Sequence, residues 1–272
     1  MANLFGCLGI KNERGSVNQL TRLPSIKAAH SIFSIALVSS LLLAACGGGG
    51  GKAPTPTVSL SPREITDRSA KVMLAVNSLH FLIERNGVIA YLDEEEVLGF
   101  KRAEGDFEQP DRVRTKIRIV TEVTPFDIAF IALGDEQYVT DPLSGGWRQI
   151  PPEWGFNPAI IFDSEVGILK LLQEGLENLS LVGSDKIDGL PHYRLAGQVN
   201  AERIREMSAG LIGRGQVRVE IWIGADDFYM RQAHLVEPET DPQDPTTWEF
   251  RFSAFNEPIE IQAPSEVIPE GE

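Results

Sequence analysis

Apolar positions recur with two different periods between residues 61 and 256, and the change of period predicts where helices and strands lie. Ser61, Pro62 and Glu64 form a capping box with proline in the first turn, so a helix is expected to begin there. The mostly apolar face of this helix is expected to consist of Ile65, Ser69, Val72, Met73 and Val76. From Asn77 onward the period is two, which predicts strands.

The first expected strand ends at Asn86-Gly87, a dipeptide typical of hairpin turns. Residues 112–122 form the clearest strand, because basic residues alternate with apolar ones along it. One face of the sheet should therefore be solvated and the other covered. Further strands are expected at residues 97–107, 126–133, 137–140, 179–187, 191–199, 216–223, 228–237 and 247–256. A turn at Asp188-Gly189 is expected to join the strands at 179–187 and 191–199.

Two helical segments are expected to interrupt the strands. Asn157-Pro158 opens the first, and Asn200 caps a second, shorter one that carries Ile204 and Met207. The first segment is rich in apolar residues and should lie against the apolar side of the sheet. These residues are Ile160, Ile161, Ile168, Leu169, Leu171, Leu172 and Leu176. The pattern predicts an α+β domain that is mainly β, with helices over one face of an antiparallel sheet.

An apolar run at residues 32–46 precedes the domain. It is shorter than the roughly 20 residues that span a bilayer, but it has the length of the apolar part of an export signal. A basic region lies before it, and it ends in Leu43-Ala44-Ala45-Cys46, which resembles the bacterial lipobox. In a lipobox the signal is cut before the cysteine, which is acylated. A buried core strand with an incidental cysteine is the alternative interpretation.

This interpretation divides the chain into four parts. Residues 1–45 are expected to be a cleaved signal peptide, and residues 46–60 an acylated cysteine with a flexible tether of Gly, Pro and Thr. Residues 61–263 are expected to form a single domain, followed by a disordered tail at residues 264–272. The expected location is the extracytoplasmic face of the cell membrane, to which the acyl chains attach the protein.

The charge of the mature chain limits its partners. Residues 1–45 hold four of the 25 basic residues and one of the 39 acidic ones, so their removal leaves a net charge of −17. Such a chain is repelled by nucleic acid and by anionic head groups, so no nucleic-acid partner is expected. Cys7 lies in the signal and Cys46 carries the lipid, so no disulfide is expected either.

Few residues suggest catalysis or metal binding. The mature histidines, His80, His192 and His234, are far apart in sequence and lie in expected strands, where structural or surface roles are expected. The acidic residues 93–96 could bind a cation, but a solvated loop is the favoured interpretation because no spaced ligand set lies nearby. No zinc, phosphate-loop or nucleophile-elbow motif occurs. We therefore expect no enzyme activity, no cofactor and no metal.

Several segments resemble the LppX/LprA/LprF/LprG lipoproteins over most of residues 60–260. They are Trp147-Arg148-Gln149-Ile150-Pro151, Asn157-Pro158 with Gly167-Ile168-Leu169, residues 183–189 with 193–197, and residues 219–227. The resemblance implies a strongly curved antiparallel half-barrel, helices over its concave face and a lipid-holding cavity between them, as in the Lol lipoprotein carriers. Family members bind or move acylated lipids and glycolipids outside the inner membrane. This chain departs from the family in its excess of acidic over basic residues and in a long insertion at residues 237–246.

Two functions remain open at this point. One is a carrier that holds a lipid or glycolipid in the cavity, with a membrane transporter as a further partner. The other is a sensor or scaffold lipoprotein of the same fold that regulates a membrane partner. A carrier needs a cavity that stays open, whereas a scaffold can fill it with side chains.

A ligand would lie against apolar side chains from both the strands and the helical region, although an ordinary core would use the same residues. The expected ligand-binding residues are Phe81, Ile83, Ile117, Ile119, Ile128, Phe130, Ile160, Ile161, Leu169, Leu172, Val219, Ile221, Phe250 and Phe252.

Overall fold

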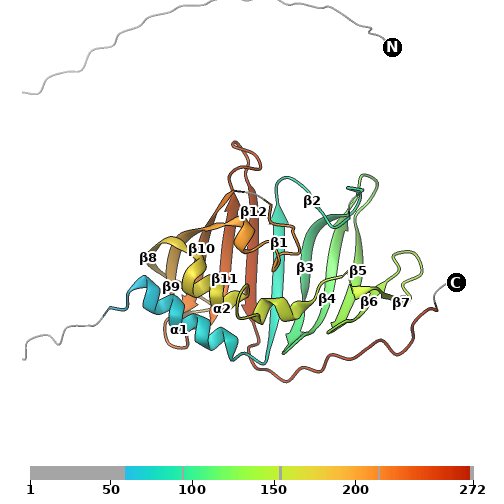
Figure 1. Ribbon diagram of the computed structural model, residues 1–272, viewed down its shortest axis with the longest axis horizontal. Coiled ribbons are helices and arrows are strands. Elements are labelled where there is room, and N and C mark those ends of the chain that lie inside the picture. Colours follow the sequence, from blue (N-terminus) through green and yellow to red (C-terminus); the bar gives the residue numbers. More distant parts are fainter. Residues whose placement is uncertain (1–58, 94, 153–154, 214, 270–272) are drawn as a thin grey trace, which may run out of the picture. The chain divides into compact units, whose positions relative to one another are not determined.

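The computed structural model describes residues 59–269 except 94, 153–154 and 214. The expected signal peptide, Cys46 and nearly all of the tether lie outside the described residues. Within the described part, twelve strands form one antiparallel sheet that does not close (Figure 1). The strands are β1 (Ser78–Asn86), β2 (Ala90–Tyr91), β3 (Gly99–Glu108), β4 (Arg112–Val120), β5 (Phe126–Leu133), β6 (Glu136–Thr140), β7 (Trp147–Ile150), β8 (Glu177–Ile187), β9 (Leu190–Asn200), β10 (Gln216–Gly224), β11 (Met230–Glu237) and β12 (Thr246–Ser253).

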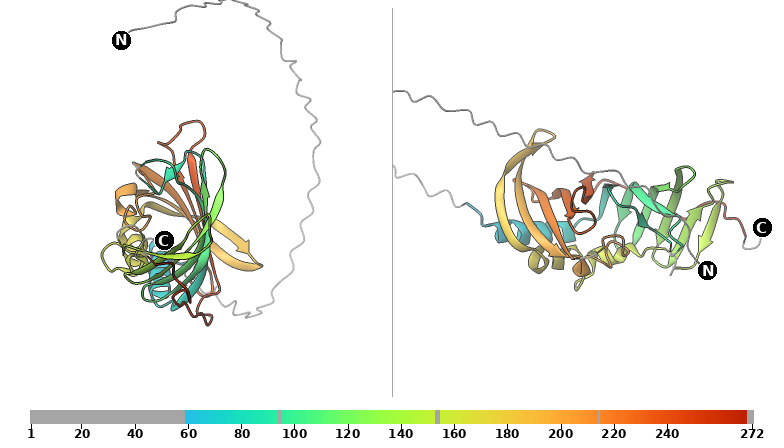
Figure 2. Two further views of the ribbon diagram at one scale, coloured as in Figure 1. Left: turned by 90° about the vertical axis from the view of Figure 1, so that its right-hand side faces the viewer. Right: turned by 90° about the horizontal axis from the view of Figure 1, so that it is seen from above.

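The sheet is built from two runs of neighbouring strands joined at one long-range pair. Its order is β7-β6-β5-β4-β3-β1-β12-β11-β10-β9-β8, with β2 paired to β3. The junction is the antiparallel pair of β1 and β12, which sets Ile83 opposite Phe250. The expected strands are therefore confirmed, whereas β2 and β7 were not predicted. Viewed end on, the sheet curves around the helices, which lie on its concave side (Figure 2).

The first helix, α1 (Pro62–Leu74), begins as predicted. The backbone N–H of Ser61 donates to the Glu64 carboxylate at 2.8 Å, and the Glu64 N–H donates to the Ser61 hydroxyl at 3.3 Å, which completes the capping box. Ile65 and Met73 are buried in the same core as strand residues such as Val217. The apolar stripe read from the sequence therefore faces the sheet.

Arg63, on the first turn of α1, joins this helix to the second helical region. Its guanidinium donates to the carbonyl oxygens of Leu172 and Leu176, each at 3.1 Å, and to that of Gln173. These carbonyls lie at the end of a helical segment, where the last carbonyl groups have no partner within the helix. Arg63 therefore satisfies them and holds the two helical regions together.

The apolar helical region expected from Asn157 exists, but it is broken into short pieces. These are η2 (Pro158–Phe162), α2 (Ile168–Lys170) and the π-type turn η3 (Leu171–Gly175). The break has a local cause: the Asp163 carboxylate accepts from Glu165 N at 2.7 Å, and a Cβ at Gly167 would lie 2.5 Å from the Asp163 carbonyl oxygen. A side chain that competes for backbone donors favours a turn over a helix. The shorter segment is one turn, η4 (Ala201–Arg203), capped by Asn200 as predicted.

The two faces of the sheet differ as the alternation predicts. Along β4, the charged residues Arg112, Arg114, Lys116 and Arg118 are exposed, while Val113, Thr115 and Ile119 on the other face are buried.

At the β8 edge of the sheet, the tip of the β8–β9 hairpin is the predicted Asp188-Gly189 turn, with positive φ at both residues. In the expected tail, Ile268 N donates to Trp147 O of β7 at 2.7 Å.

Gly105 of β3 lies where two strands approach too closely for a side chain. A Cβ there would lie 2.1 Å from the carbonyl oxygen of Arg114 and 2.6 Å from Cα of Thr115, both on β4. Gly183 of β8 is a matched contrast, because a Cβ there would meet nothing within 4 Å.

We predict that Gly105→Ala lowers the free energy of unfolding by about 1–3 kcal/mol, because backbone atoms must move to make room. Gly183→Ala should change it by no more than about 0.5 kcal/mol. Denaturant unfolding of both variants checks this. Equal effects of the two substitutions would contradict the close approach of β3 and β4.

Candidate functional site

One row of apolar side chains crosses most of the sheet on its concave face. The cross-strand pairs Ile117↔Ile128, Ala103↔Ile117 and Ile83↔Ala103 continue through Ile83↔Phe250 to β11 and β10. Because directly paired residues point to the same face, the row is continuous. It runs Ile128, Ile117, Ala103, Ile83, Phe250, Ala233, Ile221, Leu195 across β5, β4, β3, β1, β12, β11, β10 and β9.

All ten expected ligand-binding residues on strands lie on this face by their register. They are Phe81, Ile83, Ile117, Ile119, Ile128, Phe130, Val219, Ile221, Phe250 and Phe252. The four helical candidates divide into two pairs. Leu172 is buried in the core and Leu169 packs against it, whereas Ile160 and Ile161 are half-buried and lie outside the core cluster of the described residues. In their helix, Phe162 stacks on Phe107 instead, with ring centroids 4.7 Å apart.

Burial divides the concave face into a closed part and a more open part. Under α1 and η3, Val219, Ile221 and Leu172 keep 7% or less of their surface accessible. Nearer the middle of the sheet, large apolar side chains are only half-buried although they point to the covered face. They are Phe81, Ile83, Ile117, Phe250 and Phe252. The middle of this face therefore keeps accessible apolar surface.

A pocket of about 520 Å³ lies elsewhere. It is lined largely by side chains of the solvated face and by the β8–β9 turn, including His80, Glu104, Arg231 and Arg251. Phe252 is the one expected ligand-binding residue in its lining. Its mixture of acidic and basic groups does not suit a hydrocarbon chain, so it is not the expected lipid cavity.

Sequence reasoning missed a buried polar group on the concave face. Arg85, Glu237 and Trp248 keep 5%, 2% and 2% of their surface accessible. The indole N–H of Trp248 donates to Glu237 Oε1 at 2.7 Å, Gly213 N donates to Glu237 Oε2 at 2.8 Å, and the guanidinium of Arg85 lies 5.3 Å from the centre of the Trp248 ring. Burial lowers the pKa of Arg85 from its usual value, and the charge of Glu237 offsets part of this effect.

The alternation of side chains along β1 could have indicated this buried group. Arg85 follows Phe81 and Ile83 at a spacing of two, so it occupies the apolar face rather than the charged one. A charged residue in an apolar register predicts a buried polar group.

Comparison with known proteins places the chain in a family. A model of the family described as LppX_LprAFG lipoprotein matches residues 61–261. The chain belongs to the LppX_LprAFG lipoprotein family. The resemblance seen in the sequence is thereby confirmed, and the match covers the whole described sheet. No curated protein matches the sequence.

Two solved structures of LppX_LprAFG lipoproteins share the fold of this chain. LprF from Mycobacterium bovis is 19% identical with a TM-score of 0.61, and the alignment covers 75% of this chain and 96% of LprF. LppX from Mycobacterium tuberculosis is 20% identical with a TM-score of 0.54, and the alignment covers 74% of this chain and 98% of LppX. The mainly β, half-barrel fold expected from the sequence is confirmed.

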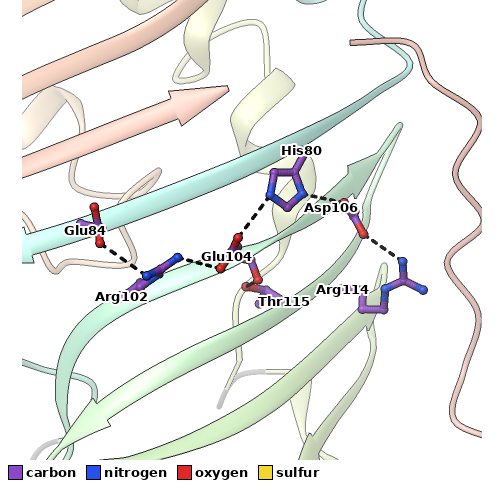
Figure 3. A network of polar contacts seen from close by, with 7 residues as sticks. All are labelled: His80, Glu84, Arg102, Glu104, Asp106, Arg114 and Thr115. Carbon is purple, nitrogen blue, oxygen red and sulfur yellow. Dashed lines mark hydrogen bonds and ion pairs between the residues drawn. The ribbon is translucent and has the colours of Figure 1, made fainter. Parts of the chain in front are cut away.

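In this member of the LppX_LprAFG family, the three histidines of the described residues lie on strands β1, β9 and β11. His80 belongs to a chain of charged groups on the solvated face (Figure 3). His192 is fully buried and its Nδ1 lies 2.8 Å from the carbonyl oxygen of Leu190, whereas His234 is half-buried. Among the described residues, no group of three or more His, Cys, Asp or Glu side chains could hold a metal ion. In the same part of the chain, no helix is long and apolar enough to cross a membrane.

The charged chain links β1, β3 and β4 through alternating acids and bases. Asp106 lies near one end of this chain, between His80, whose Nδ1 is 2.9 Å away, and Arg114, whose Nη2 is 2.8 Å away (Figure 3). Burial raises the pKa of Asp106, but the hydrogen bonds and charges of His80 and Arg114 outweigh it, and the pKa falls below its ordinary 3.8. The network therefore stabilises the pairing of these strands while Asp106 is ionised.

We predict that Asp106→Asn costs at most about 1 kcal/mol at pH 7, because its partners are well exposed. The folded-state pKa is depressed, so this stability is fully present above the unfolded value near 3.8 and is lost as pH falls through the lower folded value. Unfolding of both proteins between pH 7 and pH 2 should show a difference that shrinks at the acid end. A pH-independent difference would contradict the role of ionised Asp106, and Asp244→Asn in an exposed loop is the control.

Proposed function

We propose that this chain is a membrane-anchored lipoprotein that binds an acylated lipid or glycolipid on its concave face and carries or presents it outside the cytoplasmic membrane. The observation that supports this most is the set of half-buried apolar side chains in the middle of that face. Membership of the LppX_LprAFG lipoprotein family is consistent with this proposal.

Hydrocarbon burial would supply the affinity. Covering a half-exposed Phe81, Ile83 or Phe250 with an acyl chain removes apolar surface of both partners from water, and burial of the chain contributes about 0.8 kcal/mol per CH₂. The hydrophobic effect is not directional, so the face would select weakly among tails of similar length. Selection would depend on the polar part of the ligand.

Acylation of Cys46 would keep the domain beside its lipid source. Two acyl chains on one residue give stable attachment, whereas a single chain binds a membrane only reversibly. The Gly, Pro and Thr tether that follows would let the domain move near the membrane surface without leaving it.

Two tryptophan substitutions test where the ligand lies. Ile117 is half-buried in the open part of the face and Val219 is buried in the closed part. We predict that Ile117→Trp reduces uptake of a fluorescent fatty acid at little cost in stability, whereas Val219→Trp costs about 1–3 kcal/mol by overpacking. Fluorescence titration and denaturant unfolding give the two readouts.

The difference in stability between the two variants, together with lipid uptake by the unsubstituted chain, decides whether the middle of the face is a ligand site or an ordinary core. If Ile117→Trp unfolds as readily as Val219→Trp and the unsubstituted chain takes up no lipid, the middle of the face is an ordinary core. A sensor or scaffold lipoprotein would then be the better description.

We predict that Cys46→Ser prevents acylation and leaves an uncut precursor or a released protein. Fractionation of cells, followed by mass measurement of the amino terminus, checks both results. Normal cleavage together with membrane retention of this variant would remove the anchor from the proposal.

A further inference from the structure

Arg85 is the one lysine or arginine among the described residues that is buried. It lies near the end of β1 on the concave face, directly opposite Trp248 of β12, and keeps 5% of its surface accessible. Arginines on the other face, such as Arg114 and Arg251, are exposed and paired with carboxylates. Arg85 therefore needs a separate explanation.

The guanidinium of Arg85 has no hydrogen-bond acceptor among the described residues. Its Nε is fully buried without a partner, and no ion pair joins it to Glu237. Both oxygens of Glu237 are already held, one by Trp248 Nε1 and one by Gly213 N. A guanidinium carries five N–H donors, and leaving the buried Nε–H of Arg85 unpaired is costly. Stacking on the Trp248 ring satisfies none of them.

Arg85 also lies at one end of the accessible apolar surface. The pairs Phe81↔Phe252, Ile83↔Phe250 and Arg85↔Trp248 follow one another along β1 and β12 at a spacing of two residues. Arg85 is therefore about 13 Å along the strand from Phe81. Beyond it, the segment between β1 and β3 exposes large apolar side chains: Val88, Ile89, Tyr91, Leu92, Val97 and Leu98. Along the chain, Arg85 therefore lies between this exposed apolar segment and the apolar residues Phe81 and Ile83 of the concave face.

We infer that Arg85 is a head-group site for an amphiphile, binding a carboxylate or phosphate oxyanion while the hydrocarbon lies on Phe81, Ile83 and Phe250. The planar guanidinium fork matches two oxygens of either group, and such charge-assisted bonds are stronger than neutral ones. The inference rests on the proposed function, because it requires that the face binds lipid. It adds that the ligand is anionic and fixes the direction in which it lies.

Matched lipid pairs test the inference on residues 47–272, which contain every described residue. One pair is palmitate and its methyl ester; the other is dipalmitoyl phosphatidic acid and dipalmitoyl glycerol, each offered in phosphatidylcholine vesicles. Within each pair the tails are identical and only the oxyanion differs. Bound lipid is measured by extraction and mass spectrometry for the unsubstituted chain, Arg85→Met, Arg85→Lys and Arg251→Met.

The unsubstituted chain should prefer the anionic member of at least one pair by about tenfold or more, as expected for a charge-assisted bond. Arg85→Met should bring that ratio close to one without weakening binding of the neutral member. Arg85→Lys should keep part of the preference. Arg251→Met, which removes an exposed arginine from the solvated face of β12, should keep all of it. The pair that shows the preference identifies the oxyanion.

Two results would overturn the inference. Equal binding of both members by the unsubstituted chain excludes an oxyanion site while leaving the lipid-binding proposal intact, and this result needs no variant to fold. If Arg85→Met folds and still prefers the anionic lipid, the oxyanion site lies at another residue. If Arg85→Met does not fold, the same conclusion follows when Arg85→Lys and Arg251→Met show an equal preference for the anionic lipid. Binding of neither member would instead reject the proposed function itself.

Discussion

Burial of one continuous apolar face by a small amount of helix is the constraint on which the rest of this structure depends. Eight strands place an apolar side chain in a single row, from Ile128 on β5 to Leu195 on β9. In the part of the chain that the structure describes, α1 supplies 13 residues against this face and no other helix element has more than five. The helices bury Val219 and Ile221, but the middle of the sheet keeps half-buried aromatic and aliphatic side chains. Incomplete coverage is what would make a hydrocarbon ligand favourable there.

The polar contacts maintain this arrangement from both sides of the sheet. On the concave side, Arg63 of α1 donates to carbonyl oxygens at the end of η3 and so links the two helical regions that cover the sheet. On the solvated side, alternating acids and bases from β1 to β4 lie in the register that the apolar row requires. Each exposed ion pair contributes little to the free energy of unfolding, so most of the stability comes from burial of the apolar face. The charged pairs mainly favour one strand register.

Local features were predictable from the sequence because they depend on neighbouring residues. The capping box at Ser61, the alternation along β4 and the Asp188-Gly189 turn all involve residues a few positions apart. The pairing of β1 with β12 was not, because it joins segments about 170 residues apart, as in Phe81↔Phe252, and no local pattern specifies it. The broken helix at Asp163 was missed because the apolar periodicity outweighed a side chain that competes for backbone donors.

In the candidate site, too, some features follow from local sequence and others depend on packing between distant segments. The ten strand residues expected to share a face do so, since alternation determines which side each one occupies. How deeply each is buried depends on where the short helices end, so the difference between half-buried Ile117 and buried Val219 could not be read from the pattern. Arg85 was predictable in position but not in its lack of an acceptor, which depends on how Glu237, Trp248 and Gly213 pack together.

Native mass spectrometry would test most directly whether the concave face holds a lipid. Residues 47–272 would be exported through a cleavable signal of the non-acylated kind and purified without detergent. We expect a bound species whose added mass is that of an acylated lipid, and we expect it to be lost on denaturation and restored by incubation with lipid vesicles. A chain that is folded but carries no added mass before or after such incubation would contradict it.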